Sequence, residues 1–290
     1  MLISLCNEVI RELSLPQQCE FARKVGYDGL EIAPFTLGDD PHLLAAGRRA
    51  EIRRAACDAG IAITGLHYLM LMPAGLSITS SDAGQRARTV DVMRRLCGLA
   101  ADLGAKVLVH GSPAQRQLEP SRETEGQKWG AECFAAVADT AAGVGVTYCI
   151  EALAAPENQF ITTIAEAAAI VRAIANPAVR TMIDCSAAGR SETRTIPDLI
   201  QHWLPTGLIA HVHLNDPNRR GPGEGDLKFA PILAALAANG YQGMVAIEPF
   251  VYEPDGPACA ARAIGYVRGA LEAKVAKSGV ADGRDCVHPR

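Results

Sequence analysis

The residues that decide the fold lie in four short apolar segments: YCIEAL (148–153), TMIDCS (181–186), AHVHLND (210–216) and VAIEPF (245–250). Each segment ends in a side chain that can bind a metal ion, namely Glu151, Asp184, His211 or His213, and Glu248. The spacings of 33, 29 and 35 residues between these side chains are each about one strand, one helix and their loops. The pattern therefore predicts successive parallel strands whose carboxyl ends share one site.

The rest of the chain repeats the same alternation of β-rich runs and helical stretches, which indicates a parallel sheet. Strands are predicted at 2–6, 28–33, 61–67, 105–111, 146–151, 180–185, 208–214 and 243–249. Helices are predicted at 15–25, 42–59, 83–103, 124–144, 161–175, 195–203, 228–239 and 257–275. The first strand lacks the Gly-rich phosphate turn of many open doubly wound sheets. We therefore expect an α/β protein with one closed (β/α)8 TIM barrel over residues 1–276 and a flexible tail over 277–290.

Composition excludes several classes of partner. The 290 residues carry a formal net charge of −4 without a long Lys or Arg cluster, so we expect no nucleic-acid partner. No apolar run approaches the ~18 residues of a membrane span, and the first residues lack a basic leader, so we expect no membrane association. Nine cysteines occur singly, mostly in apolar segments, which is typical of buried thiols in a reducing compartment. These features predict a cytoplasmic protein.

The four strand-end side chains also indicate the kind of metal. Two glutamates, one aspartate and one histidine form a hard, oxygen-rich set, which suits Mn²⁺ or Mg²⁺, with Co²⁺ as a further option. A structural zinc site would instead favour thiolates. A carboxylate at the end of a buried strand is costly unless a cation or hydrogen bonds compensate it. We therefore expect one divalent ion, with Mn²⁺ preferred, at this end of the barrel.

The same segments carry a family resemblance. HVHLNDPNRRGPGEGDL (211–227) followed by GYQGMVAIEPF (240–250) resembles the xylose isomerase-like barrel superfamily, and most closely its D-tagatose and D-psicose 3-epimerase group. The resemblance runs from the first strand to about residue 275. It implies a homodimer or homotetramer that acts on a small carbohydrate. It also implies that Glu151, Asp184, His213 and Glu248 bind one divalent metal ion, and it assigns the proton transfer to Glu151 and Glu248. It also implies that Glu157 and Arg219 bind substrate hydroxyls.

An alanine and the strand-end histidines qualify this resemblance. The epimerases place a substrate-binding histidine three residues after the strand-six aspartate, where this chain has Ala187. His67 and His110 end the predicted third and fourth strands, and we expect both to contact substrate oxygens. Of the two histidines in HVH, we interpret only His213 as facing the barrel interior, with His211 in a supporting or packing position.

The resulting hypothesis is a divalent-metal-dependent epimerase or isomerase of a ketose or keto-sugar, with C3 epimerisation favoured. One glutamate removes a proton beside the carbonyl, and the other returns a proton to the opposite face of the cis-enediolate. The alternatives are a dehydratase of the inosose dehydratase type and a hydroxypyruvate isomerase-like activity. A nuclease resembling endonuclease IV and a non-catalytic sugar-binding barrel are less favoured. Arg116, Arg219 and Arg220 leave a phosphorylated sugar open as the substrate.

Overall fold

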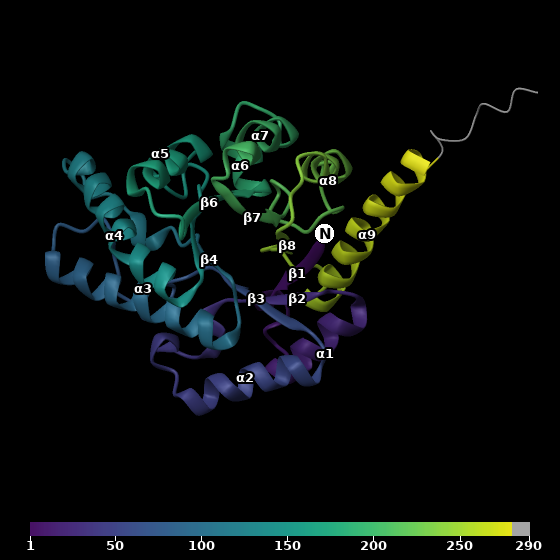
Figure 1. Cartoon of the computed structure of the whole chain (residues 1–290), viewed down its shortest axis with the longest axis horizontal. Helices are drawn as coiled ribbons and strands as arrows, with labels where there is room; N and C mark the ends of the chain where they lie inside the picture. Colours follow the sequence, from purple (N-terminus) through teal and green to yellow (C-terminus); the bar gives the residue numbers. More distant parts are fainter. Residues whose placement is uncertain (280–290) are drawn as a thin grey trace, which may run out of the picture.

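Eight parallel strands close into a barrel. The computed structural model describes residues 1–279, and Figure 1 shows the strands as an inner ring surrounded by the helices. The strands follow one another around the ring in chain order, and β1 pairs with β8 to close it. The strands are β1 Leu2–Cys6, β2 Gly29–Ile32, β3 Ala62–Leu66, β4 Val107–His110, β5 Thr147–Ile150, β6 Val179–Asp184, β7 Ile209–Leu214 and β8 Met244–Ile247. The predicted closed TIM barrel is confirmed.

Helices connect the strands on the outside of the barrel. The α-helices are α1 Leu15–Val25, α2 Ala46–Asp58, α3 Ala83–Leu103, α4 Glu123–Val144, α5 Ile164–Ile174, α6 Cys185–Ser191, α7 Ile196–Trp203, α8 Phe229–Ala238 and α9 Gly256–Gly279. Short 3-10 turns are η1 Asn7–Ile10, η2 Pro34–Leu37, η3 Pro41–Leu43, η4 Ala114–Arg116 and η5 Leu204–Thr206. Helix ends follow the sequence signals, since Gly104 and Gly145 adopt left-handed caps after α3 and α4.

Two differences from the sequence-based prediction have local causes. The helix predicted over 42–59 begins only at Ala46, because Pro41–Leu43 forms a separate 3-10 turn and Ala45 is extended. Helix α6 was not predicted. It starts immediately after β6, and the Asp184 side chain accepts a hydrogen bond from the backbone N–H of Ala187, which caps the helix.

The strand alternation determines which side chains enter the barrel. Val109, Cys149 and Met182 form a small apolar cluster separate from the main core, which packs between the strands and the helices. Residues two positions apart on a strand point the same way. Glu151 and Asp184 therefore follow Cys149 and Met182 into the barrel interior, at the carboxyl end where the loops leave space.

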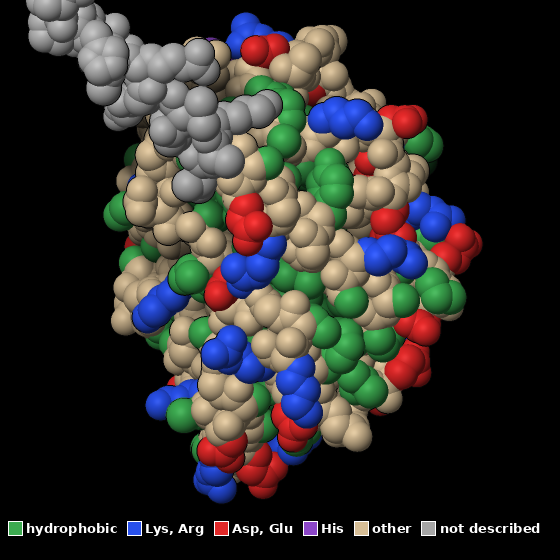
Figure 2. All heavy atoms as spheres, turned by 90° about the vertical axis from the view of Figure 1, so that its right-hand side faces the viewer, with side chains coloured by type: hydrophobic (Ala, Val, Ile, Leu, Met, Phe, Trp, Pro, Cys, Tyr) green, Lys and Arg blue, Asp and Glu red, His purple; other side chains and the backbone are tan. Residues whose placement is uncertain are grey.

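The last helix extends past the predicted domain boundary. Helix α9 continues to Gly279, three residues into the segment that we expected to be a flexible tail. The remainder of that predicted tail, residues 280–290, lies outside the described residues. Within residues 1–279, no helix is both long and apolar enough to cross a membrane. Figure 2, which faces the side that carries α9, shows basic and acidic side chains interspersed with apolar ones.

A substitution at Gly256 tests the close contact between α9 and η1. A Cβ at Gly256 would lie 1.7 Å from the carbonyl oxygen of Val9. We expect Gly256→Ala to lower the free energy of unfolding by about 1–3 kcal/mol, because a backbone atom cannot move aside as a side chain can. Gly265→Ala in the same helix is the control, since a Cβ there meets nothing within 4 Å. Urea unfolding measures both, and equal stability of the two variants would contradict this close approach.

Candidate metal centre

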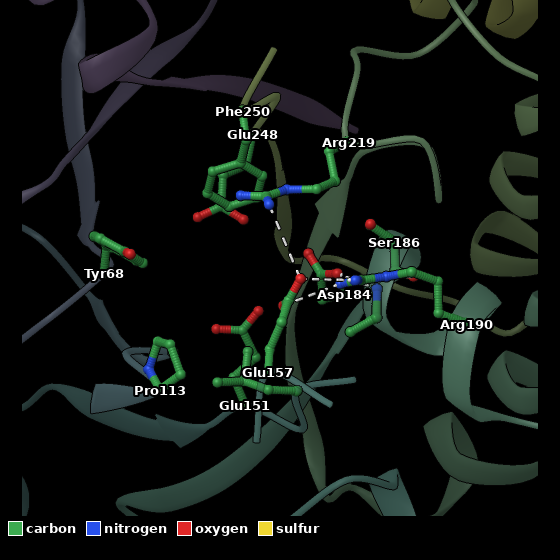
Figure 3. Close-up of a pocket in the computed structure, with 13 residues that line it drawn as sticks. Tyr68, Pro113, Glu151, Glu157, Asp184, Ser186, Arg190, Arg219, Glu248 and Phe250 are labelled. Carbon is green, nitrogen blue, oxygen red and sulfur yellow. Dashed lines mark hydrogen bonds and ion pairs between the residues drawn. The ribbon is translucent and has the colours of Figure 1, made fainter. Parts of the chain in front are cut away.

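A cavity of about 220 Å³ opens at the carboxyl ends of the strands. Figure 3 shows its acidic side chains converging from several strands. The lining residues include Glu151, Glu157, Asp184, Arg219 and Glu248 from the sequence-based prediction. The cavity therefore lies where the spacing of the strand-end residues predicted a shared site.

The four predicted metal ligands come together at the base of this cavity. Glu151, Asp184, His213 and Glu248 each present a ligand atom, and these atoms all lie within 4.8 Å of one another. All four residues are buried. Three carboxylates and one imidazole are a suitable donor set for a hard divalent ion, and burying this much negative charge calls for a compensating cation. The residues present thus fit the predicted metal.

Asp184 is held by two donors. Its Oδ1 accepts from the Ala187 backbone N–H at 2.6 Å, and its Oδ2 accepts from the Asn215 side-chain amide at 2.7 Å. Burial and the nearby Glu248 carboxylate nevertheless raise the pKa of Asp184 to about 6. Both hydrogen bonds leave the carboxylate oriented toward the cavity, where a cation would relieve the crowding of negative charges.

Glu248 and His213 orient each other. Glu248 Oε2 lies 2.9 Å from His213 Nδ1, and its Oε1 lies 2.9 Å from His67 Nδ1. Burial opposes ionisation of Glu248, but His213 and His67 lower its pKa to about 2. Conversely, these carboxylate contacts raise the pKa of His213 well above its ordinary value, despite burial. The imidazoles thus balance part of the carboxylate charge.

Glu31, which the sequence analysis did not identify, supports both histidines of HVH. Its carboxylate lies 3.0 Å from His211 Nε2 and 3.4 Å from His213 Nε2. The expectation that only His213 faces the barrel interior is wrong, because residues two apart on a strand share a face. The supporting position of His211 is confirmed, since it contacts the carboxylate that holds His213. A carboxylate behind a ligating imidazole fixes its orientation and tautomer.

Glu151 differs from the other ligands. Among the described residues, no side-chain or backbone donor makes a hydrogen bond to its carboxylate. A Cβ at Gly111 would lie 1.6 Å from Glu151 Oε2, so the carboxylate occupies space that only glycine leaves free. Burial and the carboxylates of Asp184 and Glu248 raise its pKa well above the ordinary value. Glu151 is therefore the least restrained of the four ligands.

His67 and His110 are not brought to the cavity. His67 is fully buried and bridges Glu248 to Glu8 on η1, with its Nε2 2.8 Å from Glu8 Oε2. His110 faces the helix layer, because it lies one residue after the inward-facing Val109. Its Nδ1 lies 2.8 Å from the Tyr148 hydroxyl. The sequence-based expectation of substrate contact receives no support from this placement of the two rings.

Charged side chains form the outer wall of the cavity. Arg190 makes a paired contact with Glu157, at 2.9 Å to Oε1 and 3.3 Å to Oε2. Arg219 lies 4.0 Å from the same carboxylate, and its guanidinium stacks over the Phe250 ring at 5.1 Å. Figure 3 shows both arginines pointing toward Glu157. The hydrogen bond from Arg190 lowers the pKa of Glu157, so its carboxylate is ionised.

The other two arginines considered for a phosphorylated substrate do not line the cavity. Arg116 is fully buried, and Arg220 is paired with Glu253 at 2.6 Å. Arg190 lines it instead, three residues beyond Ala187, which also lines it. Arg190 lies four residues beyond the quoted segment TMIDCS, and no residue pattern marked it, because α6 was not predicted. Glu31 did have a signal, since it is a charged residue within the otherwise apolar segment GLEI.

Comparison with known proteins agrees with the fold. The D-psicose 3-epimerase of Agrobacterium fabrum is 29% identical over 241 residues, which cover 80% of this chain and 78% of that protein. The L-ribulose 3-epimerase of Mesorhizobium japonicum is 28% identical over 233 residues, covering 80% and 74%. A solved L-ribulose 3-epimerase shares the fold, with a TM-score of 0.80 and 24% identity over 99% of this chain and 100% of that one. A model of the xylose isomerase-like TIM barrel family matches residues 19–269, and the chain therefore belongs to this family.

Proposed function

We propose that this protein is a divalent-metal-dependent epimerase of a ketose, acting at C3. The observation that carries the proposal is the placement of Glu151 and Glu248. They come from β5 and β8, share one candidate metal site, and present their carboxylates from opposite sides of the cavity (Figure 3). The relatives named as ketose 3-epimerases support the substrate class and the position of the reaction.

The two glutamates are suited to invert a carbon. One carboxylate removes the proton from the carbon beside the ketone, and the other returns a proton from the opposite side of the cavity. A bound divalent ion, with Mn²⁺ preferred, would act as a Lewis acid for the negative charge that develops on the substrate oxygens. Glu157 and Arg219 bind the substrate hydroxyls at the outer wall. Assembly as a homodimer or homotetramer and a cytoplasmic location stay sequence-based predictions.

The proton-transfer roles can be tested by isosteric substitution. Glu151→Gln and Glu248→Gln should each lower kcat by about 10²- to 10⁴-fold or more, because an amide cannot exchange the proton. Proton NMR in D2O over free ketoses, keto-inositols and hydroxypyruvate, with Mn²⁺, measures epimer formation and deuterium uptake. The exposed Glu20→Gln is the control and should retain wild-type rates. A dehydrated or isomerised product from the wild type would instead support one of the alternative activities.

Metal removal should destabilise the protein as well as inactivate it. An ion present at about 100 times its Kd adds about 2.7 kcal/mol to the free energy of unfolding. For a domain of this size we expect chelation to lower Tm by about 4–5 °C. Asp184→Asn should lose most of this metal-dependent shift. Differential scanning calorimetry with Mn²⁺ or with chelator gives the comparison, and a Tm independent of metal would contradict the proposed centre.

Arg190 should affect substrate binding more than the chemical step. Loss of its charged hydrogen bonds to Glu157 is worth about 1.5–3 kcal/mol, so Arg190→Ala should raise KM by roughly 10- to 100-fold. The double substitution Ala187→His with Arg190→Ala places an imidazole where the epimerases have one, and we expect it to recover part of the loss. Arg172→Ala, which removes a guanidinium stacked on Trp203, is the control. An unchanged KM in Arg190→Ala would exclude this role.

A further inference from the structure

Arg116 is the largest fully buried side chain among the described residues, and it has no carboxylate in direct contact. Its Nη1 donates to the backbone carbonyl oxygen of Glu151 at 2.6 Å, and its Nη2 donates to that of His110. Its Nε has no hydrogen-bond partner. Burying a guanidinium costs several kcal/mol unless its surroundings compensate it. Its place beside the metal centre therefore calls for an explanation.

The two carbonyls lie where β4 and β5 separate. Their pairing ends at His110 and Ile150, and the next backbone hydrogen bond, from Glu151 N–H to His110 O, is long at 3.4 Å. Arg116 bridges the two strands just beyond this point. Its planar fork of donors is rigid, so it holds the two carbonyls at a set separation, as one more rung of the ladder would. Arg116 thereby restrains the backbone of Glu151.

This restraint matters because Glu151 has no other. Donors orient the Asp184 carboxylate, and imidazoles orient Glu248. No donor reaches the Glu151 carboxylate among the described residues, and the carboxylate lies against Gly111. Burial lowers the pKa of Arg116 to about 10, which leaves the guanidinium charged at neutral pH. Arg116 thus also places a permanent positive charge next to the cluster of buried acids.

We propose that Arg116 is the positioning residue for Glu151, which it holds at the metal and substrate through the two backbone carbonyls. This inference rests on the proposed function, in that Glu151 is taken as a metal ligand and a proton carrier. Arg116 itself touches neither the cavity nor the reacting atoms. Its loss should therefore loosen one ligand of the centre while the other three keep their own hydrogen bonds.

The test compares metal affinity with stability in matched variants. In Arg116→Met, we expect the Kd for Mn²⁺, measured by calorimetry, to rise about 10- to 100-fold, as for other residues that orient metal ligands. Arg116→Lys keeps the charge and should recover part of the affinity. Tyr27→Phe is the control, because Tyr27 is also fully buried and donates to a backbone carbonyl, that of Ala260, away from the centre. It should lower Tm but leave the Kd unchanged.

Turnover provides a second readout. With D-psicose as the probe, Arg116→Met should lower kcat and leave KM nearly unchanged, because the outer wall that binds hydroxyls is intact. A folded Arg116→Met variant that binds Mn²⁺ with wild-type affinity would overturn the positioning role of Arg116 but not the proposed reaction. A wild type that binds Mn²⁺ but turns over no ketose would contradict the proposed reaction and leave the positioning role standing.

A measurement on the wild type covers the case in which the variants do not fold. The side-chain ¹⁵N–¹H signals of Arg116 can be followed by NMR during a titration with diamagnetic Mg²⁺. Because the guanidinium is bonded to the backbone that carries Glu151, its signals should shift in step with metal binding. Signals that stay constant while Mg²⁺ saturates the centre would refute the coupling.

Discussion

Closure of the barrel between β1 and β8 is the constraint on which the site depends. It brings Glu248 at the end of β8 next to Glu8, which follows β1, and both contact His67 after β3. It also lets Glu31 on β2 reach across the interior to the histidines of β7. An open sheet would leave these groups on separate strands, far from one another.

Because the barrel closes, several acidic side chains are buried close to one another. Glu8, Glu31, Glu151, Asp184 and Glu248 are all less than one tenth exposed. The protein offsets part of this charge with imidazoles, with the amide of Asn215 and with the buried guanidinium of Arg116. These partners are distributed unevenly, so Glu248 is held in the ionised form while ionisation of Glu151 is disfavoured. An uneven distribution of this kind is what a pair of carboxylates with different proton-transfer roles requires.

The outer wall is where this chain differs from the epimerase pattern. Ala187 leaves space in the cavity wall, and Arg190, one helical turn later on α6, points in instead and pairs with Glu157. A guanidinium is longer and permanently charged, so it changes which groups of a substrate can be bound there without altering the metal centre. Under the proposed function, the reaction chemistry belongs to the candidate metal centre and the substrate preference to the outer wall.

The sequence by itself determined the barrel and the strand-end positions of the four candidate metal ligands, because strand and helix periodicity and the spacing of strand-end residues are local properties. It also indicated Glu157 and Arg219 through their resemblance to the epimerases. The positions of Glu8, Glu31, Arg116 and Arg190 relative to the centre were decided only by the tertiary structure. Glu31 contacts His211 and His213, which lie 180 and 182 positions away, and Arg190 lies on an unpredicted helix. His110 shows the same limit, since a one-residue change in strand register decides whether a side chain faces the cavity or the helices.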